Sequence, residues 1–126
     1  MRENLEKWGA PNIAVSNAEP RDFAAPGGWF DVVVADAPCS GEGLFRKDPD
    51  AVREWSPAQV ERCALRQQDI LAHAAGALAP GGILVYSTCT FNRLEDENNA
   101  AWLGETLGLE RLRLSLPPEW NIVASD

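Results

Sequence analysis

Two short, largely apolar segments constrain the fold most, because each runs directly into a turn that carries a cysteine. Residues 30–35 (FDVVVA) are followed by Asp36-Ala37-Pro38-Cys39, and residues 83–87 (ILVYS) are followed by Thr88-Cys89-Thr90. Continuous rather than alternating hydrophobicity is typical of a parallel strand that is covered on both faces. We therefore predict two buried parallel strands, with the strand at 30–35 in the centre of the sheet.

A long helix is expected between these two strands. Ser56-Pro57-Ala58-Gln59 supplies an N-cap, a proline in the first turn and a capping-box glutamine. Pro80-Gly81-Gly82 is expected to end the helix. The apolar residues at helical spacing are Val60, Cys63, Ala64, Leu71, Ala74, Ala75 and Leu78.

The rest of the chain continues the alternation of helix and strand signals. Residues 2–8 are helix-like, residues 13–16 form a short β-branched run, and Asp48-Pro49 can cap a short helix that reaches Trp55. A further helix is expected from Asn92 to Leu107, ended by Gly108, and then a last strand at 109–116. This order predicts one α/β domain over residues 1–126, with a doubly wound parallel sheet.

In such sheets the reactive groups gather at the carboxyl ends of the strands. A single long helix separates the two strands, so they should be neighbours about 4.8 Å apart, and Cys39 and Cys89 should face one pocket. Cys63 lies on an apolar helix stripe, where a thiol is usually a small hydrophobe. With no CxxC pair and one isolated histidine, His73, the sequence indicates neither a disulfide framework nor a metal site.

The charge balance limits the partners. Nineteen acidic residues against 11 basic ones give a net charge of −8, which opposes free-standing nucleic-acid binding. Arg46 and Lys47, next to the Cys39 turn, are the best local phosphate contacts, although they could equally be solvated charges. No apolar run approaches the roughly 20 residues that span a bilayer, and the N-terminus has no secretory signal, so we expect a cytoplasmic protein without membrane contact.

Two motifs carry a family resemblance. DAPCSGEGLFRKDPDAVREWSP and, after the long helix, PGGILVYSTCTF strongly resemble the bacterial ribosomal RNA cytosine-C5 methyltransferases, which are related to the NOL1/NOP2/Sun group. The resemblance runs from about Leu5 to Leu107. It implies a Rossmann-like, class I sheet, S-adenosyl-L-methionine as cofactor, RNA as partner (ribosomal RNA above all), and 5-methylcytosine as product.

The resemblance also implies roles for individual residues. Cytosine C5 becomes able to attack a sulfonium methyl group once a thiolate has added to C6, and by resemblance Cys89 is that nucleophile. Cys39 would assist breakdown of the adduct, and Asp36 would contact the cofactor or the N3/N4 edge of the base. The implied cofactor-binding residues are Asp36, Ala37, Pro38, Asn17 and Glu19. The implied substrate-binding residues are Pro38, Arg46 and Lys47.

The sequence departs from the family at its N-terminal side. The glycine-rich cofactor loop of the family has no counterpart upstream of Asn12, and AAPGG at 24–28 is interpreted as a loop that matches by chance. We therefore expect a truncated sheet without the first two strands, which should be marginally stable or self-associating because an apolar strand edge is left unpaired. Two other functions stay open, namely a non-enzymatic α/β fragment and a small-molecule methyltransferase.

Overall fold

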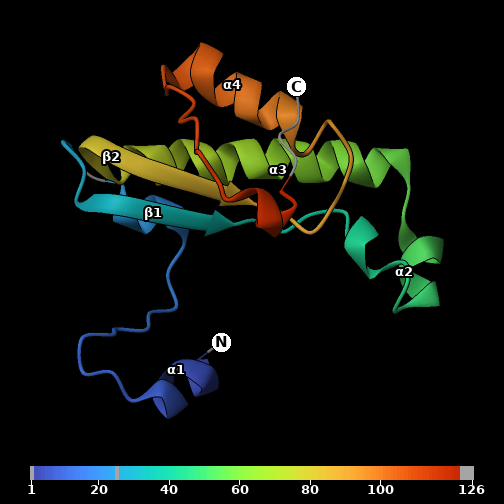
Figure 1. The fold of residues 1–126 in the computed structure, drawn as a ribbon, viewed down its shortest axis with the longest axis horizontal. Coiled ribbons are helices and arrows are strands. Elements are labelled where there is room, and N and C mark those ends of the chain that lie inside the picture. Colours follow the sequence, from blue (N-terminus) through green and yellow to red (C-terminus); the bar gives the residue numbers. More distant parts are fainter. Residues whose placement is uncertain (1, 25, 123–126) are drawn as a thin grey trace.

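A two-stranded parallel sheet forms the centre of the structure, a computed structural model that describes residues 2–24 and 26–122 (Figure 1). Strand β1 (Phe30–Asp36) pairs with strand β2 (Leu78–Ser87), and helix α3 (Pro57–Gly76) lies between them in sequence. The predicted α/β class and the predicted pairing of these two strands are confirmed.

Helix α3 begins where the sequence predicts and ends earlier. The Ser56 hydroxyl accepts a hydrogen bond from the Gln59 backbone N–H at 3.3 Å, as an N-cap should. At the other end, the carbonyl of Ala77 accepts hydrogen bonds from the backbone N–H groups of Trp29 and Phe30 at 2.8 and 3.1 Å. The sheet ladder therefore starts directly after the helix.

Strand β2 is consequently longer than predicted. The prediction that Pro80-Gly81-Gly82 ends the helix is wrong, because these residues lie inside β2. Phe30 pairs with Leu78 whereas Val32 pairs with Ile83, so β2 carries extra residues there as a bulge.

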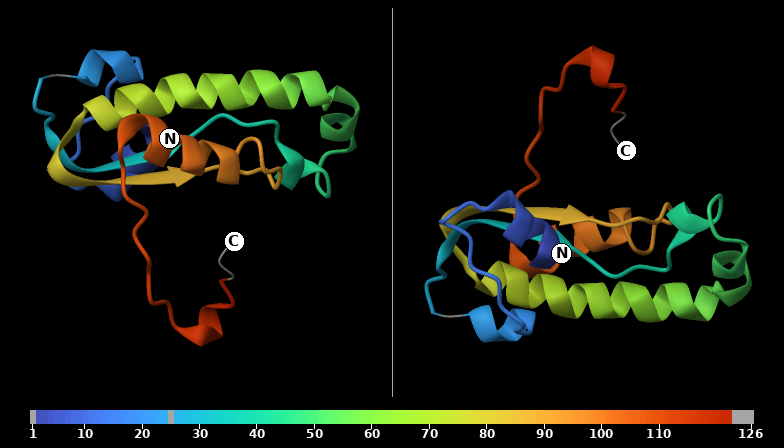
Figure 2. Two further views of the ribbon diagram at one scale, coloured as in Figure 1. Left: turned by 90° about the horizontal axis from the view of Figure 1, so that it is seen from above. Right: turned by 90° about the horizontal axis from the view of Figure 1, so that it is seen from below.

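Helices α3 and α4 (Glu97–Leu107) cover the same face of the sheet (Figure 2). The core consists of Ala35 from β1, Leu71 from α3 and Leu103 from α4. Trp102 packs against this core, and the other partly buried contributors are Leu84, Tyr86, Leu107 and Leu109.

The opposite face of the sheet is uncovered in the described part of the chain. Its side chains are apolar and exposed, with Val34 65% exposed, and the others are Val32, Ile83 and Val85. The prediction that the strand at 30–35 is central and covered on both faces is therefore wrong for the described residues.

Residues 13–16 do not form the predicted strand. The segment is extended and unpaired, and Ile13 and Val15 are exposed. A strand gains stability only from the ladder and the packing that a neighbour provides, and no described segment other than β2 pairs with β1. One edge of β1 is therefore free.

The C-terminal segment also differs from its prediction. Residues 109–116 are not a strand, because Gly108 ends α4 in the left-handed conformation (φ 67°) and the chain then leaves the sheet towards η3 (Pro118–Trp120) (Figure 2). Helix α4 starts at Glu97, after a turn in which the Asn92 side-chain oxygen accepts from the Glu95 N–H at 3.0 Å. Asn92 thus caps this turn and does not begin the helix itself.

The remaining elements are short. Helix α1 (Arg2–Trp8) forms as predicted and packs against no other helix or strand of the described part, whereas η1 (Pro20–Phe23) packs on α3. Of the AAPGG segment, Ala24 and residues 26–28 are loop, as interpreted, and Ala25 lies outside the described residues.

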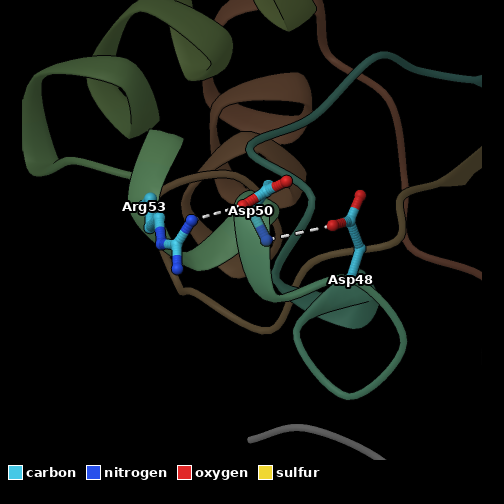
Figure 3. Close-up of polar contacts among 3 residues, drawn as sticks. All are labelled: Asp48, Asp50 and Arg53. Atoms are coloured by element: carbon cyan, nitrogen blue, oxygen red, sulfur yellow. Dashed lines mark hydrogen bonds and ion pairs between the residues drawn. The ribbon is translucent and has the colours of Figure 1, made fainter.

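Helix α2 (Pro49–Glu54) is capped as the sequence predicts (Figure 3). The Asp48 carboxylate accepts from the Asp50 N–H at 3.0 Å, and Arg53 pairs with the Asp50 carboxylate at 2.8 Å. Both partners of that ion pair are exposed, so it contributes little to stability. Helix α2 and the preceding turn η2 (Glu42–Leu44) follow the Cys39 turn.

Candidate active site

The site begins where the two strands end side by side. Asp36 lies opposite Ser87 in the ladder, and the Ser87 hydroxyl donates to the Asp36 carboxylate at 2.9 Å. One more ladder bond follows, from the Ala37 N–H to the Ser87 carbonyl at 2.9 Å. The two turns therefore leave the sheet in a fixed relation to each other.

These turns bring two thiols into contact. The Sγ atoms of Cys39 and Cys89 are 2.9 Å apart, and the backbone N–H of Cys89 donates to Cys39 Sγ at 3.3 Å. Both cysteines are free; Cys89 is exposed and Cys39 is half-buried. The predicted proximity of Cys39 and Cys89 is confirmed, whereas Cys63 lies half-buried on α3.

Burial keeps the Cys39 thiol protonated. Burial, reinforced by the hydrogen bond to the Cys89 side chain, raises the pKa of Cys39 from 9.0 to about 11. Cys39 therefore keeps its proton at neutral pH and can donate its S–H to a neighbouring sulfur. The arrangement pairs a protonated, shielded thiol with an exposed one.

A layer of buried polar side chains lies beneath the two turns. The Glu95 carboxylate, 0% exposed, accepts from the Ser40 backbone N–H at 2.9 Å and from the side-chain amides of Gln67 and Asn92, both at 2.7 Å. Sequence reasoning missed this layer. Its one signal was Gln67, a polar residue that interrupts the apolar stripe of α3 between Ala64 and Leu71.

Tyr86 and Asn99 complete this layer from β2 and α4. The Tyr86 hydroxyl lies 2.9 Å from the Gln67 side-chain oxygen and 2.5 Å from the Glu95 backbone carbonyl, and the Asn99 amide donates to the same Gln67 oxygen at 2.9 Å. Burial raises the pKa of Tyr86 to about 12, so this hydroxyl remains a donor at neutral pH. Tyr86 and Asn99 thus extend the hydrogen bonds of this layer to β2 and α4.

Two residues that follow the Cys39 turn, Glu42 and Gly43, form hydrogen bonds with the backbone of the Cys89 turn. The Gly43 N–H donates to the Cys89 carbonyl at 2.8 Å. The Glu42 carboxylate accepts from the Phe91 N–H at 3.1 Å and from the Trp55 indole N–H at 3.2 Å. Trp55 thus acts as a packing residue, and the Phe45 and Trp55 rings meet edge to face.

A groove of about 500 Å³ runs along the free edge of β1. Asp36, Ala37 and Pro38, three of the implied cofactor-binding residues, line it, and Asp36 is the only charged side chain among its described lining residues. Apolar walls suit an adenine ring, and a carboxylate suits a sulfonium cation. The lining thus fits part of S-adenosylmethionine, but it offers no basic side chain to the carboxylate of the amino-acid end.

The other implied site residues lie apart from the thiols. Asn17 and Glu19 are exposed and do not line the groove, and Glu19 instead forms a capping box with Asp22 at the start of η1. Arg46 and Lys47 lie on an exposed turn between η2 and α2. Within residues 2–24 and 26–122, no cluster of histidine, cysteine and acidic side chains suits a metal ion, and no helix has the length and hydropathy to cross a membrane.

Comparisons with known proteins agree on one group of enzymes. A family model for 16S rRNA methyltransferase RsmB/F matches residues 1–107. Ribosomal RNA small subunit methyltransferase F of Escherichia coli (strain SMS-3-5 / SECEC) and that of Escherichia fergusonii are each 47% identical over 107 residues, which are 84% of this chain and 22% of the relative. The chain thus spans about a fifth of the length of these relatives.

Two solved structures are similar as well. NSun6 from Pyrococcus horikoshii, solved with the S-adenosylmethionine analogue SFG, matches with a TM-score of 0.72 and 30% identity over 83% of this chain and 27% of that one. The crystal structure of PH0851 matches with a TM-score of 0.58 and 32% identity, covering 60% of this chain and 17% of that one.

Proposed function

The chain belongs to the 16S rRNA methyltransferase RsmB/F family, and from this premise we propose that it carries the nucleophilic part of an enzyme that methylates cytosine C5 in ribosomal RNA. The observation that carries the proposal is the contact between the exposed Cys89 thiol and the protonated Cys39 thiol at the ends of two parallel strands. A site that only bound RNA would have no use for this pair.

In the proposed reaction Cys89 is the nucleophile. Its thiolate adds to C6 of an unstacked cytosine, and C5 then has enamine character and takes the methyl group. S-adenosylmethionine, when bound, supplies that methyl group. Loss of the C5 proton to solvent then breaks the C6–S bond, and Cys89 leaves as a thiolate.

Cys39 has a complementary role in this proposal. With a pKa of about 11 it is a hydrogen-bond donor, and its sulfur lies 2.9 Å from that of Cys89. The Cys39 S–H can therefore stabilise the departing thiolate and favour release of the product. Asp36, whose Oδ1 accepts from Ser87, has Oδ2 to offer to the sulfonium group or to the base.

The test uses a chimera in which the matched 107 residues of the Escherichia coli relative are replaced by those of this chain. With RNA that contains 5-fluorocytosine, we expect a covalent adduct that Cys89→Ala abolishes and that the matched control Cys63→Ala leaves intact. Cys39→Ala should form the adduct with unmodified RNA and release it slowly. If Cys39→Ala forms no adduct while Cys89→Ala traps one, the two roles must be exchanged.

A second candidate, the non-enzymatic fragment, is favoured by the lining of the groove. Because Asp36 is its only charged side chain among the described residues, binding of the cofactor by the chain alone should be weak. Calorimetric titration with S-adenosylmethionine distinguishes the two: millimolar or undetectable binding supports the fragment, and micromolar binding supports a cofactor site within this chain. The adduct described above would exclude a small-molecule methyltransferase.

A further inference from the structure

Glu95 occupies an unusual position beneath the thiol pair. It lies in the turn before α4, its side chain is 0% exposed, and its partners come from three separate segments. They are the Ser40 N–H, the Gln67 amide and the Asn92 amide, at 2.7–2.9 Å. All three partners donate an N–H to the carboxylate oxygens, whereas the NH₂ group of a glutamine at this position would face these donors.

The peptide groups on both sides of Cys39 are tied to this carboxylate and its partner. The Gln67 amide nitrogen donates to the Pro38 carbonyl at 2.9 Å and to Glu95 at 2.7 Å, and the Ser40 N–H donates to Glu95 at 2.9 Å. The peptide groups before and after Cys39 are thus both anchored by hydrogen bonds. They fix the backbone of Cys39 and, through it, the position of the thiol.

The Cys89 turn is held by the same group. Asn92, three residues after Cys89, donates to the other Glu95 oxygen at 2.7 Å, and the Thr90 hydroxyl lies 3.1 Å from the Ser40 hydroxyl. Ser40 and Thr90, each directly after a cysteine, are both buried. Glu95 therefore connects the two turns from below while the thiols meet above.

We propose that Glu95 is a positioning residue that holds the Cys39 thiol against Cys89. It does so as a buried acceptor shared by both turns and contacts neither sulfur. The proposal rests on the proposed function only for its consequence in methyl transfer, because the spacing of the thiols is a property of the chain itself.

The experiment measures that spacing directly. Phenylarsine oxide condenses with two adjacent thiols to give one As(SR)₂ group and one water molecule, so its binding reports whether two sulfurs can meet. The experiment uses a Cys63→Ala background, where Cys39 and Cys89 are the only thiols. There Glu95→Gln should lower the affinity for phenylarsine oxide at least about tenfold, because the NH₂ group of the new glutamine faces N–H donors. Glu97→Gln is the matched control, because one oxygen of Glu97 is buried without a hydrogen-bond partner and should not contribute to the spacing.

Circular dichroism must show the same helix content in all variants. A folded Glu95→Gln variant with the affinity of the parent would overturn the proposal. If Glu95→Gln does not fold, Asn92→Ala removes one of the three donors to the Glu95 carboxylate together with the cap of its turn, and it should lower the affinity several-fold. A folded Asn92→Ala variant with unchanged affinity would overturn the proposal equally.

The two proposals fail in different ways. Chelation by the arsenical needs neither RNA nor cofactor. If the chain chelates and the chimera forms no RNA adduct, the proposed function alone is contradicted. If the chimera forms the adduct and the Glu95→Gln variant of the chain chelates normally, the role of Glu95 alone is contradicted.

Discussion

The backbone of Gly43 lies against that of the candidate nucleophile, so Gly43→Ala perturbs the site by a single methyl group. A Cβ atom at Gly43 would lie 2.6 Å from the carbonyl oxygen of Cys89, whereas real Cβ atoms essentially never come closer than 3.0 Å to another atom. The neighbour is backbone and cannot rotate away, so the Cys89 turn must retreat by at least about 0.4 Å.

The expected cost follows from what that movement breaks. The Gly43 N–H donates to the same carbonyl at 2.8 Å, and weakening this bond costs about 1 kcal/mol. Strain from overpacking adds about 1–3 kcal/mol. Since misplacement of a reacting group by about 1 Å can lower a rate about a hundredfold, we expect adduct formation by the chimera to fall about tenfold or more.

Urea unfolding and the RNA adduct assay measure the two effects. The matched control is Gly76→Ala, where the added Cβ makes an ordinary 3.5 Å contact with the Ala24 side chain at the end of α3. That substitution should leave adduct formation unchanged and be neutral or stabilising by up to about 1 kcal/mol. Equal stability and equal adduct formation in Gly43→Ala and the parent would show that this close approach does not position Cys89.

Other predictions concern single groups. The pKa of Cys39 in the folded chain, about 11, exceeds the ordinary value of 9.0. The protonated Cys39 thiol therefore contributes fully to the free energy of unfolding below pH 9, and this contribution is lost as the pH rises through 11. Urea unfolding of the parent and of Cys39→Ala across this range should show the loss. In the same window, iodoacetamide with mass spectrometry should label the exposed Cys89 before Cys39. Tyr86→Phe should lower the free energy of unfolding by about 1–3 kcal/mol, because buried polar partners lose their hydrogen bonds. Ser56→Ala should lower it by about 1 kcal/mol through loss of the N-cap of α3. Size-exclusion chromatography should show concentration-dependent self-association through the free edge of β1.

Local signals predicted the parts of the fold that are local in origin. The caps at Asp48 and Ser56 and the stop at Gly108 depend on a few neighbouring residues, and the structure has all three. The juxtaposition of Cys39 and Cys89 was predictable as well, because parallel strands bring their carboxyl ends to one edge.

The segments at 13–16 and 109–116 show where such reasoning ends. Both have the composition of strands, yet neither finds a ladder among the described residues, and strand propensity without a partner does not make a strand. The bulge in β2 was hidden for a related reason. Pro80-Gly81-Gly82 has the composition of a helix stop, and only the pairing of Leu78 with Phe30 shows that the strand has already begun.

The buried polar layer was hidden because its partners are distant in sequence. Ser40 and Gln67 are separated from Glu95 by 55 and 28 residues, and hydropathy alone places a glutamate on the surface. A polar side chain on a buried stripe, such as Gln67, is the observation that would have predicted a buried acceptor opposite it.

The two halves of the proposed chemistry depend on different parts of the fold. Gln67, Tyr86 and Asn99 come from α3, β2 and α4, and Glu95 comes from the turn before α4. All four lie on the covered face of the sheet, and none of them lines the groove along β1. The thiol pair therefore needs only the packed side of the molecule, whereas the groove with Asp36 depends on whatever lies along the free edge of β1. It follows that the chain alone should hold Cys39 against Cys89, and chelate an arsenical, even under conditions in which it does not bind the cofactor.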